Sequence, residues 1–432
     1  MTGRKLRIAA GLALVTLTVG LCVSLSSTGK ASDLPAPEPA PVCLNETLSN
    51  ELSDTSSLSG LDARIASYMR QWCLRGTSLA IMRGDSLLYA KGYGWADEEA
   101  GVRMAPTNIM RVASVSKLLT ATGIMMLQER GKLTLADTVF GPRGILNDSL
   151  YTSIIKDKNY YKITVEDLLR HKGGFTSYGG DPMFSTRTIM IQNHLDTPPD
   201  HETLMKTQLK RRLRFAPGTS QYYSNFGYLL LSMIVEKVSG IDYETFMRDS
   251  VLYRAGCYDM HIGGNYYEDR LPNEVRYYNG ADTCLVEEYN NSGNMVERCY
   301  GGSDVRALSG AGGWVTSVPE LARFVASIDG RPEIPDIISA RSVADMTQWF
   351  DEQTYSLGWN DTKPTREWTR TGTLSGTSAL IKYYPDGECW IMVTNTSTWK
   401  GPGFTRQTAA LFRDLRSRYS SALPARNLFL AR

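Results

Sequence analysis

The sequence predicts an α+β fold, in which an antiparallel sheet built from both chain ends is flanked by helices and accompanied by a mainly helical second lobe. The first observation is a pair of hairpin patterns, one near each end of the chain. Strand-like runs flank short turns at residues 78–82 and 86–91 around Arg83-Gly84-Asp85, and at 379–384 and 388–394 around Pro385-Asp386-Gly387. A further strand is expected at residues 368–373.

The second observation is that the chain between these hairpins is mainly helical and irregular. Helices are expected at residues 116–129, 164–169, 227–238, 243–249, 319–327 and 405–418. The segment 263–302 is rich in Tyr, Asn and Gly and predicts a long loop or lid. We therefore expect one domain at 61–420, with an α/β part at 61–140 and 305–420 and a helical lobe at 141–304.

Composition indicates a folded protein with no nucleic-acid partner. The 432 residues are 42% hydrophobic and 21% charged, close to the globular average. The formal net charge of the 47 basic and 45 acidic residues is only +2, whereas phosphate-backbone binding needs a strongly basic surface.

The first 60 residues predict an export signal followed by a linker. Residues 1–31 have a basic start, an apolar run and a small-residue end, which is typical of a signal peptide or an uncleaved anchor. Residues 32–60 begin with alternating prolines and predict a spacer. A secreted or periplasmic protein is expected, with membrane anchoring through the leader as the alternative. Residues 1–31 hold four basic and no acidic residues, so the remainder carries a net charge of −2.

Cysteine usage is compatible with an oxidising compartment. The chain has seven cysteines, and Cys22 lies in the leader, which leaves six. An even number in an exported protein is compatible with disulfide bonds, and Cys284 with Cys299 is the pair we expect.

Several common kinds of catalytic site are absent from the sequence. Four histidines without an HExxH motif and the lack of paired CxxC motifs argue against a catalytic metal. No G-x-S-x-G nucleophile elbow and no glycine-rich phosphate loop is found. We therefore expect no metal held by the protein.

A serine and a lysine at the start of an apolar helix are the strongest catalytic candidates. S-x-x-K occurs four times, but only Ser114 and Lys117 open a long apolar helix, which such a pattern buries. Residues three apart share a helical face, so the Lys117 amine can reach the Ser114 hydroxyl. The alternative is an N-cap serine with a solvent-exposed lysine.

Two further motifs offer groups for proton transfer and substrate binding. Tyr223 and Asn225 follow a Pro-Gly turn and precede an apolar helix, which suits proton transfer and substrate holding. In Arg370-Thr371-Gly372-Thr373, the first two residues could hold a substrate carboxylate, Gly372 permits close approach, and the Thr373 N–H could join that of Ser114 in an oxyanion hole. The alternatives are a helix-capping asparagine and an ordinary strand with an exposed arginine.

These motifs, in this order, resemble those of the serine β-lactamase and penicillin-binding-protein family, most closely its class C, D,D-peptidase and esterase branch. Supporting blocks are 109–118, Leu168-Leu-Arg-His-Lys-Gly-Gly-Phe175, Tyr223-Ser-Asn-Phe-Gly-Tyr228, 310–314 and 319–324. The resemblance covers about residues 75 to 415.

The resemblance implies an acyl-enzyme hydrolase that needs no cofactor. It makes Ser114 the nucleophile, Lys117 and Tyr223 the proton-transfer pair, Asn225 a substrate and lysine partner, and 370–373 the substrate-binding strand. This branch usually has Lys or His where Arg370 stands, and arginine cannot relay a proton. That departure argues against efficient β-lactam turnover more than against hydrolysis in general.

We expect a D-amino-acid-directed peptidase or carboxypeptidase, acting on a small-molecule or peptide substrate with an acyl or amide bond and a carboxylate. β-Lactamase, esterase and acyl transferase activities are the alternatives within this class. A binding or structural protein that keeps the fold without turnover is the alternative from another class.

Overall fold

The computed structural model describes residues 43–175, 180–280 and 285–431. The predicted leader lies outside these residues. Within them, no helix has both the length and the apolar character needed to span a bilayer.

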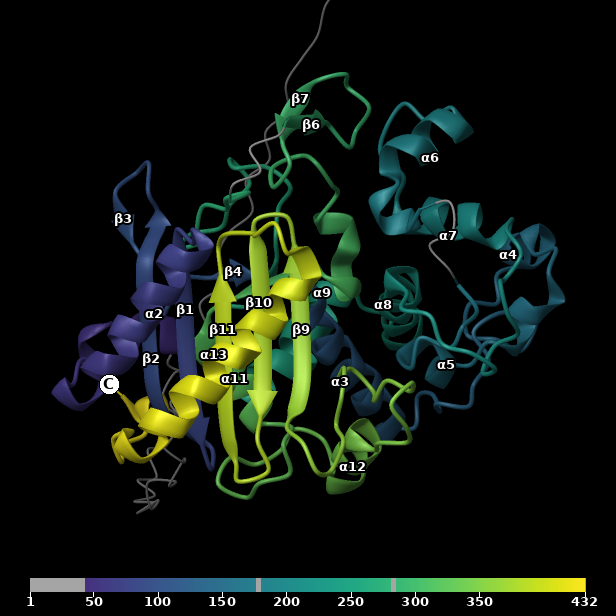
Figure 1. The fold of residues 1–432 in the computed structure, drawn as a ribbon. Helices are drawn as coiled ribbons and strands as arrows, with labels where there is room; N and C mark the ends of the chain where they lie inside the picture. The colour runs from purple at the N-terminus through teal and green to yellow at the C-terminus, as the bar shows by residue number, and fades with distance from the viewer. Residues whose placement is uncertain (1–42, 176–179, 281–284, 432) are drawn as a thin grey trace, which may run out of the picture. The chain divides into compact units, whose positions relative to one another are not determined.

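A six-stranded antiparallel sheet joins the two ends of the chain, as the sequence predicts (Figure 1). Its order is β3-β2-β1-β11-β10-β9. The strands are β1 (Gly76–Arg83), β2 (Ser86–Asp97), β3 (Val102–Arg103), β9 (Trp368–Leu374), β10 (Thr377–Tyr383) and β11 (Glu388–Thr394). Strands β1 and β11 pair from Thr77 opposite Thr394 to Arg83 opposite Glu388. The two predicted hairpins therefore meet at the centre of one sheet.

Short strands form two smaller sheets. One contains β4 (Met110–Arg111), β8 (Trp314–Thr316) and β5 (His261–Ile262), and the other β6 (Leu285–Glu287) and β7 (Met295–Glu297). The second sheet lies within the segment 263–302, which the sequence predicts as a loop. Strands of two or three residues have too little periodicity to be detected in the sequence.

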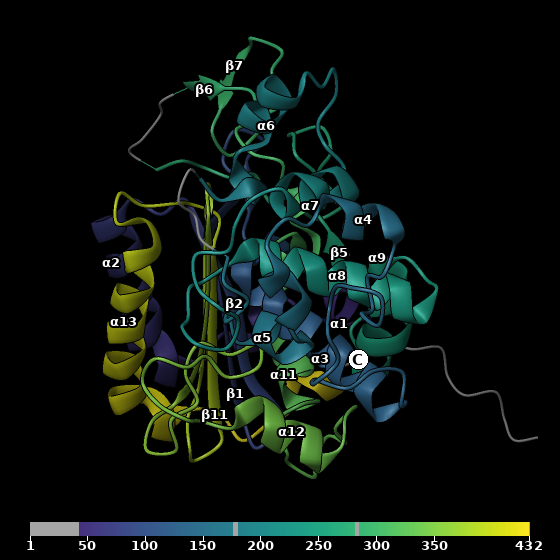
Figure 2. The same cartoon turned by 90° about the vertical axis from the view of Figure 1, so that its right-hand side faces the viewer.

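Helices cover both faces of the large sheet. Figure 2 shows α2 (Ser59–Trp72) and α13 (Phe404–Tyr419) on one face, and α11 (Val318–Ala326) on the other. Helix α2 has no counterpart in the sequence prediction, although it buries Leu61, Ile65, Tyr68 and Met69 at helical spacing. The apolar side chains of α2 and α13 form a separate core cluster with the sheet.

The folded body begins before residue 60. Residues 43–60 form α1 (Leu44–Thr47) and two 3₁₀ turns, and Leu44, Leu48 and Leu58 are buried. This differs from the linker predicted up to residue 60, because the proline-rich composition that suggested a spacer ends at Pro41.

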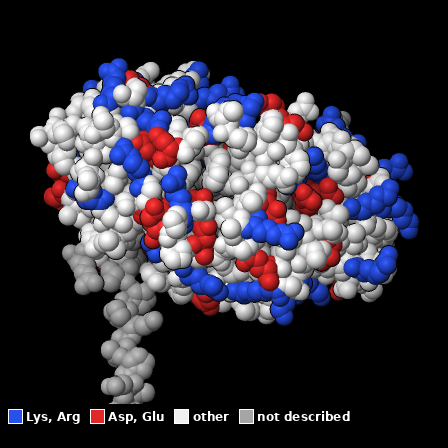
Figure 3. Space-filling view, turned by 90° about the horizontal axis from the view of Figure 1, so that it is seen from below, with Lys and Arg blue, Asp and Glu red and all other residues white. Residues whose placement is uncertain are grey.

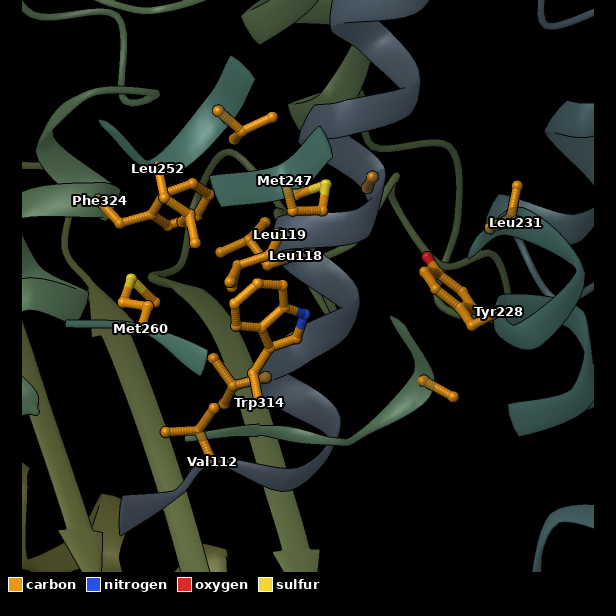
Figure 4. Close-up of a cluster of buried hydrophobic side chains, with 14 of the residues drawn as sticks. Val112, Leu118, Leu119, Tyr228, Leu231, Met247, Leu252, Met260, Trp314 and Phe324 are labelled. Atoms are coloured by element: carbon orange, nitrogen blue, oxygen red, sulfur yellow. The ribbon is translucent and has the colours of Figure 1, made fainter. Parts of the chain in front are cut away.

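The remaining helices form the second lobe and the base of the site. They are α3 (Ser116–Glu129), α4 (Ser149–Ile154), α5 (Val165–Leu169), α6 (Thr186–Asn193), α7 (His201–Leu209), α8 (Asn225–Ser239), α9 (Tyr243–Phe246), α10 (Tyr253–Ala255) and α12 (Ala340–Thr347). Helix α3 is buried from Ser116 to Leu127, as its apolar sequence predicts. Figure 4 shows Leu118 and Leu119 packed beside Trp314 and Met247, with Tyr228 on another side of the helix.

The cysteines bear on the expected disulfide bond, and the surface charges bear on the expectation that nucleic acid is not a partner. Among the described residues, Cys43, Cys73, Cys257, Cys299 and Cys389 are all free thiols. The expected disulfide cannot be followed, because Cys284 lies outside the described residues. Acidic and basic side chains are interspersed over the face in Figure 3.

Two buried carboxyl groups at the base of the sheet make stability depend on pH. Asp85 is 1% and Asp329 8% exposed. Burial and the negative charge of Asp85 raise the pKa of Asp329 to about 7. The pKa of Asp329 is higher in the folded than in the unfolded state. Its contribution to the free energy of unfolding is therefore fully present below about pH 4 and is lost as the pH rises through about 7.

Asp85→Asn is expected to stabilise the protein at pH 8 by ~1–2 kcal/mol and to change little at pH 4, because it removes one of the two like charges. Asp85 accepts a hydrogen bond from Ile334 N through Oδ2, while its buried Oδ1 has no partner among the described residues. Urea unfolding at both pH values measures the effect. An equal gain at both pH values would contradict the charge argument.

Candidate active site

Ser114 lies in a short 3₁₀ turn, Ala113–Val115, directly before α3. Ala113 has a φ of 49°, in the left-handed region that residues with a Cβ seldom adopt. The turn leaves Ser114 partly exposed while Ala113 and Val115 are buried. The serine hydroxyl is therefore presented at the surface of an otherwise packed helix start.

The Lys117 side chain is fully buried beside Ser114 and donates three hydrogen bonds. Its Nζ lies 3.2 Å from Ser114 Oγ, 2.7 Å from Asn225 Oδ1 and 2.5 Å from the carbonyl oxygen of Ala311. Of the two interpretations of this S-x-x-K motif, burial excludes the solvent-exposed lysine. Ser114 is also not the N-cap of α3, since Val115 holds that position without a side-chain cap.

Tyr223 completes a three-residue contact at the serine. Its hydroxyl donates to Ser114 Oγ at 2.8 Å, and Lys117 Nζ lies 4.9 Å from the centre of its ring. The following Ser224 is the N-cap of α8, where its hydroxyl accepts from Gly227 N. Asn225 therefore does not cap the helix, and its amide is free to bind Lys117.

The surroundings of Lys117 and Tyr223 lower the pKa of both side chains. Burial and the nearby Arg370 charge lower the pKa of Lys117 below its usual range. Burial alone would raise the pKa of Tyr223, but the positive charges of Lys117 and Arg370 outweigh it and lower that pKa. Both groups therefore lose a proton more readily than usual, and both contact the Ser114 hydroxyl, an arrangement suited to proton exchange with the serine.

Arg370 on β9 is buried rather than exposed on the strand. Only 1% of the residue is accessible, and its Nε donates to the carbonyl oxygen of Ser114 at 2.8 Å, with Nη2 donating to the same oxygen. On the same strand, Thr371 donates from its backbone N to Asn360 Oδ1 at 2.7 Å. Arg370 thus joins β9 to the backbone of the serine.

Arg370→Gln is expected to move the acidic limb of the kcat/KM profile to higher pH by about 1 unit. The catalytically active form of the site is the one in which the Lys117–Tyr223 pair has lost one proton, whichever of the two residues is the base. Removing a neighbouring positive charge makes that loss harder, so the pKa rises. Arg370→Lys keeps the charge and should leave the limb in place; a shift to lower pH in Arg370→Gln would contradict the assignment.

Gly372 brings β9 against the serine turn. A Cβ at this position would lie 2.1 Å from the carbonyl oxygen of Val112 and 3.1 Å from Ser114 N. Thr373 follows on the strand, in register with Ser378 of β10. Strand β9 therefore lies directly beside Ser114 N, one of the two N–H groups expected to form the oxyanion hole.

Gly372→Ala is expected to lower kcat/KM by ~10²-fold, because one displaced oxyanion donor costs that much, and stability by ~1–3 kcal/mol, because the backbone contact must open. Activity assays and thermal unfolding measure the two effects. Gly403→Ala is the control, because a Cβ there meets no atom within 4 Å. Wild-type activity in Gly372→Ala would show that β9 does not contact the reacting atoms.

Two neighbours of the site were missed in the sequence analysis. His171 stacks on Tyr223 with ring centres 4.4 Å apart, and burial with the Lys117 charge keeps its pKa well below the usual range. Its Nδ1 accepts a hydrogen bond from Ser224 N at 3.1 Å. Asp181 accepts from Asn225 Nδ2 at 2.7 Å. His171 appeared in the sequence only within the block 168–175, and nothing in the local sequence distinguished Asp181.

A cavity adjoins the far end of β9. Its volume is about 380 Å³, and Thr373, Leu374, Ser375, Phe184, Asn279 and Thr398 are among its lining residues. Among the described residues, no group of His, Cys, Asp or Glu is arranged to hold a metal ion.

Comparisons with known proteins show which sequences and folds this chain is similar to. Penicillin-binding protein 4* of Bacillus subtilis is 30% identical over 204 residues, which are 47% of this chain and 40% of that protein, so the chain spans less than half of this relative's length. A D-alanine carboxypeptidase from Burkholderia cenocepacia has a similar fold, with a TM-score of 0.63, 20% identity, and coverage of 84% of this chain and 99% of that one.

A D-amino acid amidase from Ochrobactrum anthropi, solved with L-phenylalanine amide, has a TM-score of 0.64 at 17% identity and covers 84% of this chain and 99% of its own. The family model described as β-lactamase matches residues 61–414. The chain therefore belongs to the β-lactamase family.

Proposed function

We propose that the protein is an exported amidohydrolase that forms an acyl-enzyme on Ser114 and cleaves amide bonds in D-amino-acid amides or peptides. The observation that carries the proposal is the convergence of Lys117 Nζ and Tyr223 Oη on Ser114 Oγ, at 3.2 and 2.8 Å. Export is supported by the leader-like residues 1–31.

The proposed reaction follows from this geometry. Ser114 Oγ attacks the amide carbonyl carbon, its proton passes to the Lys117–Tyr223 pair, and the N–H groups of Ser114 and Thr373 stabilise the oxyanion. The pair then protonates the leaving amine, and the C–N bond breaks. Water attacks the acyl-enzyme in the second step, giving the carboxylic acid and restoring Ser114.

The choice of an amide substrate is supported by the structural neighbours, which include a D-amino acid amidase and a D-alanine carboxypeptidase. The cavity of about 380 Å³ beyond Thr373 offers room for a substrate side chain or chain extension.

The test is intact-mass analysis of the purified protein after incubation with a fluorophosphonate, followed by peptide mapping. A single label on the peptide containing Ser114 is expected. Release of product is then compared for a D-Ala-D-Ala peptide, its C-terminal amide, a D-amino-acid amide, a p-nitrophenyl ester and nitrocefin.

Each outcome of the panel has a defined meaning. Faster hydrolysis of the D-Ala-D-Ala peptide than of its C-terminal amide supports recognition of a carboxylate. Exclusive turnover of the ester or of nitrocefin would replace the amidohydrolase proposal with an esterase or β-lactamase activity. An unlabelled Ser114 together with no turnover would indicate a protein that keeps the fold without catalysis.

A further inference from the structure

A carboxylate stands at the end of the hydrogen-bond chain that begins at the nucleophile. Lys117 Nζ donates to Asn225 Oδ1 at 2.7 Å, and Asn225 Nδ2 donates to Asp181 Oδ2 at 2.7 Å. The other oxygen, Asp181 Oδ1, accepts from Met183 N at 3.0 Å, which caps the turn Pro182–Phe184. Both carboxylate oxygens are therefore oriented by fixed donors.

This carboxylate has acceptor capacity left over and no cation to balance it. Each oxygen of an ionised carboxylate can accept two hydrogen bonds, and each oxygen of Asp181 accepts one from the residues that the structure describes. Among the described residues, no Lys, Arg or His forms an ion pair with Asp181, whereas other partly buried carboxylates such as Asp97 and Glu388 are paired with an arginine. The side chain is only half-buried, so a ligand can reach it.

The position of Asp181 relative to the reacting atoms indicates which ligand this would be. Its negative charge partly opposes the lowering of the Lys117 pKa, so the carboxylate lies within electrostatic range of the proton-transfer pair. The α-amino nitrogen of an amino-acid amide is attached to the carbon next to the carbonyl that Ser114 attacks. A protonated amine beside Asp181 would supply the positive charge that this carboxylate lacks among the described residues.

We propose that Asp181 binds the protonated α-amino group of the acyl part of the substrate, so that the site selects amino-acid amides and peptides with a free N-terminus over N-acylated ones. This rests on the proposed amidohydrolase function. An N-acylated substrate has no positive charge to offer, and its acyl group would have to displace water from the carboxylate without replacing those hydrogen bonds. Asn225 then positions both Lys117 and the recognising carboxylate.

The test is protection of Ser114 from fluorophosphonate labelling by D-alanine amide and by N-acetyl-D-alanine amide at pH 6.5, where an α-amino group is protonated. For the wild type we expect half-protection at a concentration at least ~10-fold lower for the free amine, because hydrogen bonds to charged groups are worth roughly 1.5–3 kcal/mol. Labelling without competitor reports the integrity of the nucleophile.

Two variants remove the charge in different ways. Asp181→Asn keeps the size, and Asp181→Ser keeps an acceptor for Met183 N. In both, the free amine should lose its ~10-fold advantage over the acetylated amide, read as the ratio of the two half-protection concentrations within the same variant. Asp196→Asn is the matched control, since Asp196 is an exposed carboxylate of the same lobe, and it should retain the advantage.

The results separate this proposal from the function on which it rests. If wild-type Ser114 takes no label and nothing is hydrolysed, the amidohydrolase function fails. If Ser114 is labelled but both amides protect equally, or neither protects, the amine recognition is wrong. Equal weakening of both amides in the Asp181 variants would assign Asp181 a positioning role only.

Discussion

The Ser114→Ala protein is expected to lose at least ~10⁴-fold of kcat/KM on every substrate that the wild type hydrolyses, and to take no fluorophosphonate label. The physical reason is that no other hydroxyl lies where Lys117 Nζ and Tyr223 Oη converge, so the acyl-enzyme cannot form. Stability should change little, because Ser114 is partly exposed and its side chain fills no core position.

A matched control comes from another S-x-x-K motif in the chain. Ser153 lies in α4, three residues before Lys156, and its hydroxyl donates to the carbonyl oxygen of Leu150 at 2.7 Å. Ser153→Ala should retain wild-type kcat/KM and labelling. Full activity in Ser114→Ala would place the nucleophile elsewhere and remove the basis of the proposed mechanism.

Lys117→Met is expected to lower kcat/KM by at least ~10³-fold, because it deletes the cation that lowers the pKa of Tyr223 and one member of the proton-transfer pair. Methionine approximates the length of the lysine chain, so the core around α3 stays filled. The acceptors Asn225 Oδ1 and Ala311 O lose their donor, and we expect some loss of thermal stability, measured by circular dichroism.

The double variant tests whether Ser114 and Lys117 act as one unit. Groups that act together show non-additive losses, so Ser114→Ala with Lys117→Met should be about as inactive as Ser114→Ala alone. Lys156→Met, in the exposed motif, should be as active as the wild type. Additive losses in the double variant would show that the lysine acts independently of the serine.

The elements that the sequence predicts well are those with a local signal. The turns Arg83-Gly84-Asp85 and Pro385-Asp386-Gly387 and the alternation around them predict four strands of the central sheet, and helix α3 begins and ends where the apolar run does. Helices α2, α6, α7 and α12 were missed, as were the shorter helices α1, α4 and α10. These amphipathic segments owe much of their stability to the surfaces they cover, which the local sequence does not contain.

The candidate site likewise contains residues that the sequence predicts and contacts that it does not predict. The sequence predicts Ser114, Lys117, Tyr223, Asn225 and residues 370–373 as its members, and the structure brings them together from three separate segments. The sequence does not predict Asp181, because one aspartate before a proline is also an ordinary turn residue. Nor does it predict that the Arg370 guanidinium binds the Ser114 carbonyl, since these residues are 256 positions apart.

The sequence by itself determined the hairpins, the buried helix after Ser114, and the order of motifs that identifies the family, because each depends on neighbours a few residues away. Only the tertiary structure decided which S-x-x-K motif has a buried lysine, which hydroxyl receives two donors, and where an unpaired carboxylate stands. Those properties arise from burial and from contacts between segments far apart in the sequence, such as Lys117 with Asn225, Ser114 with Tyr223 and Asn225 with Asp181, which no local pattern contains.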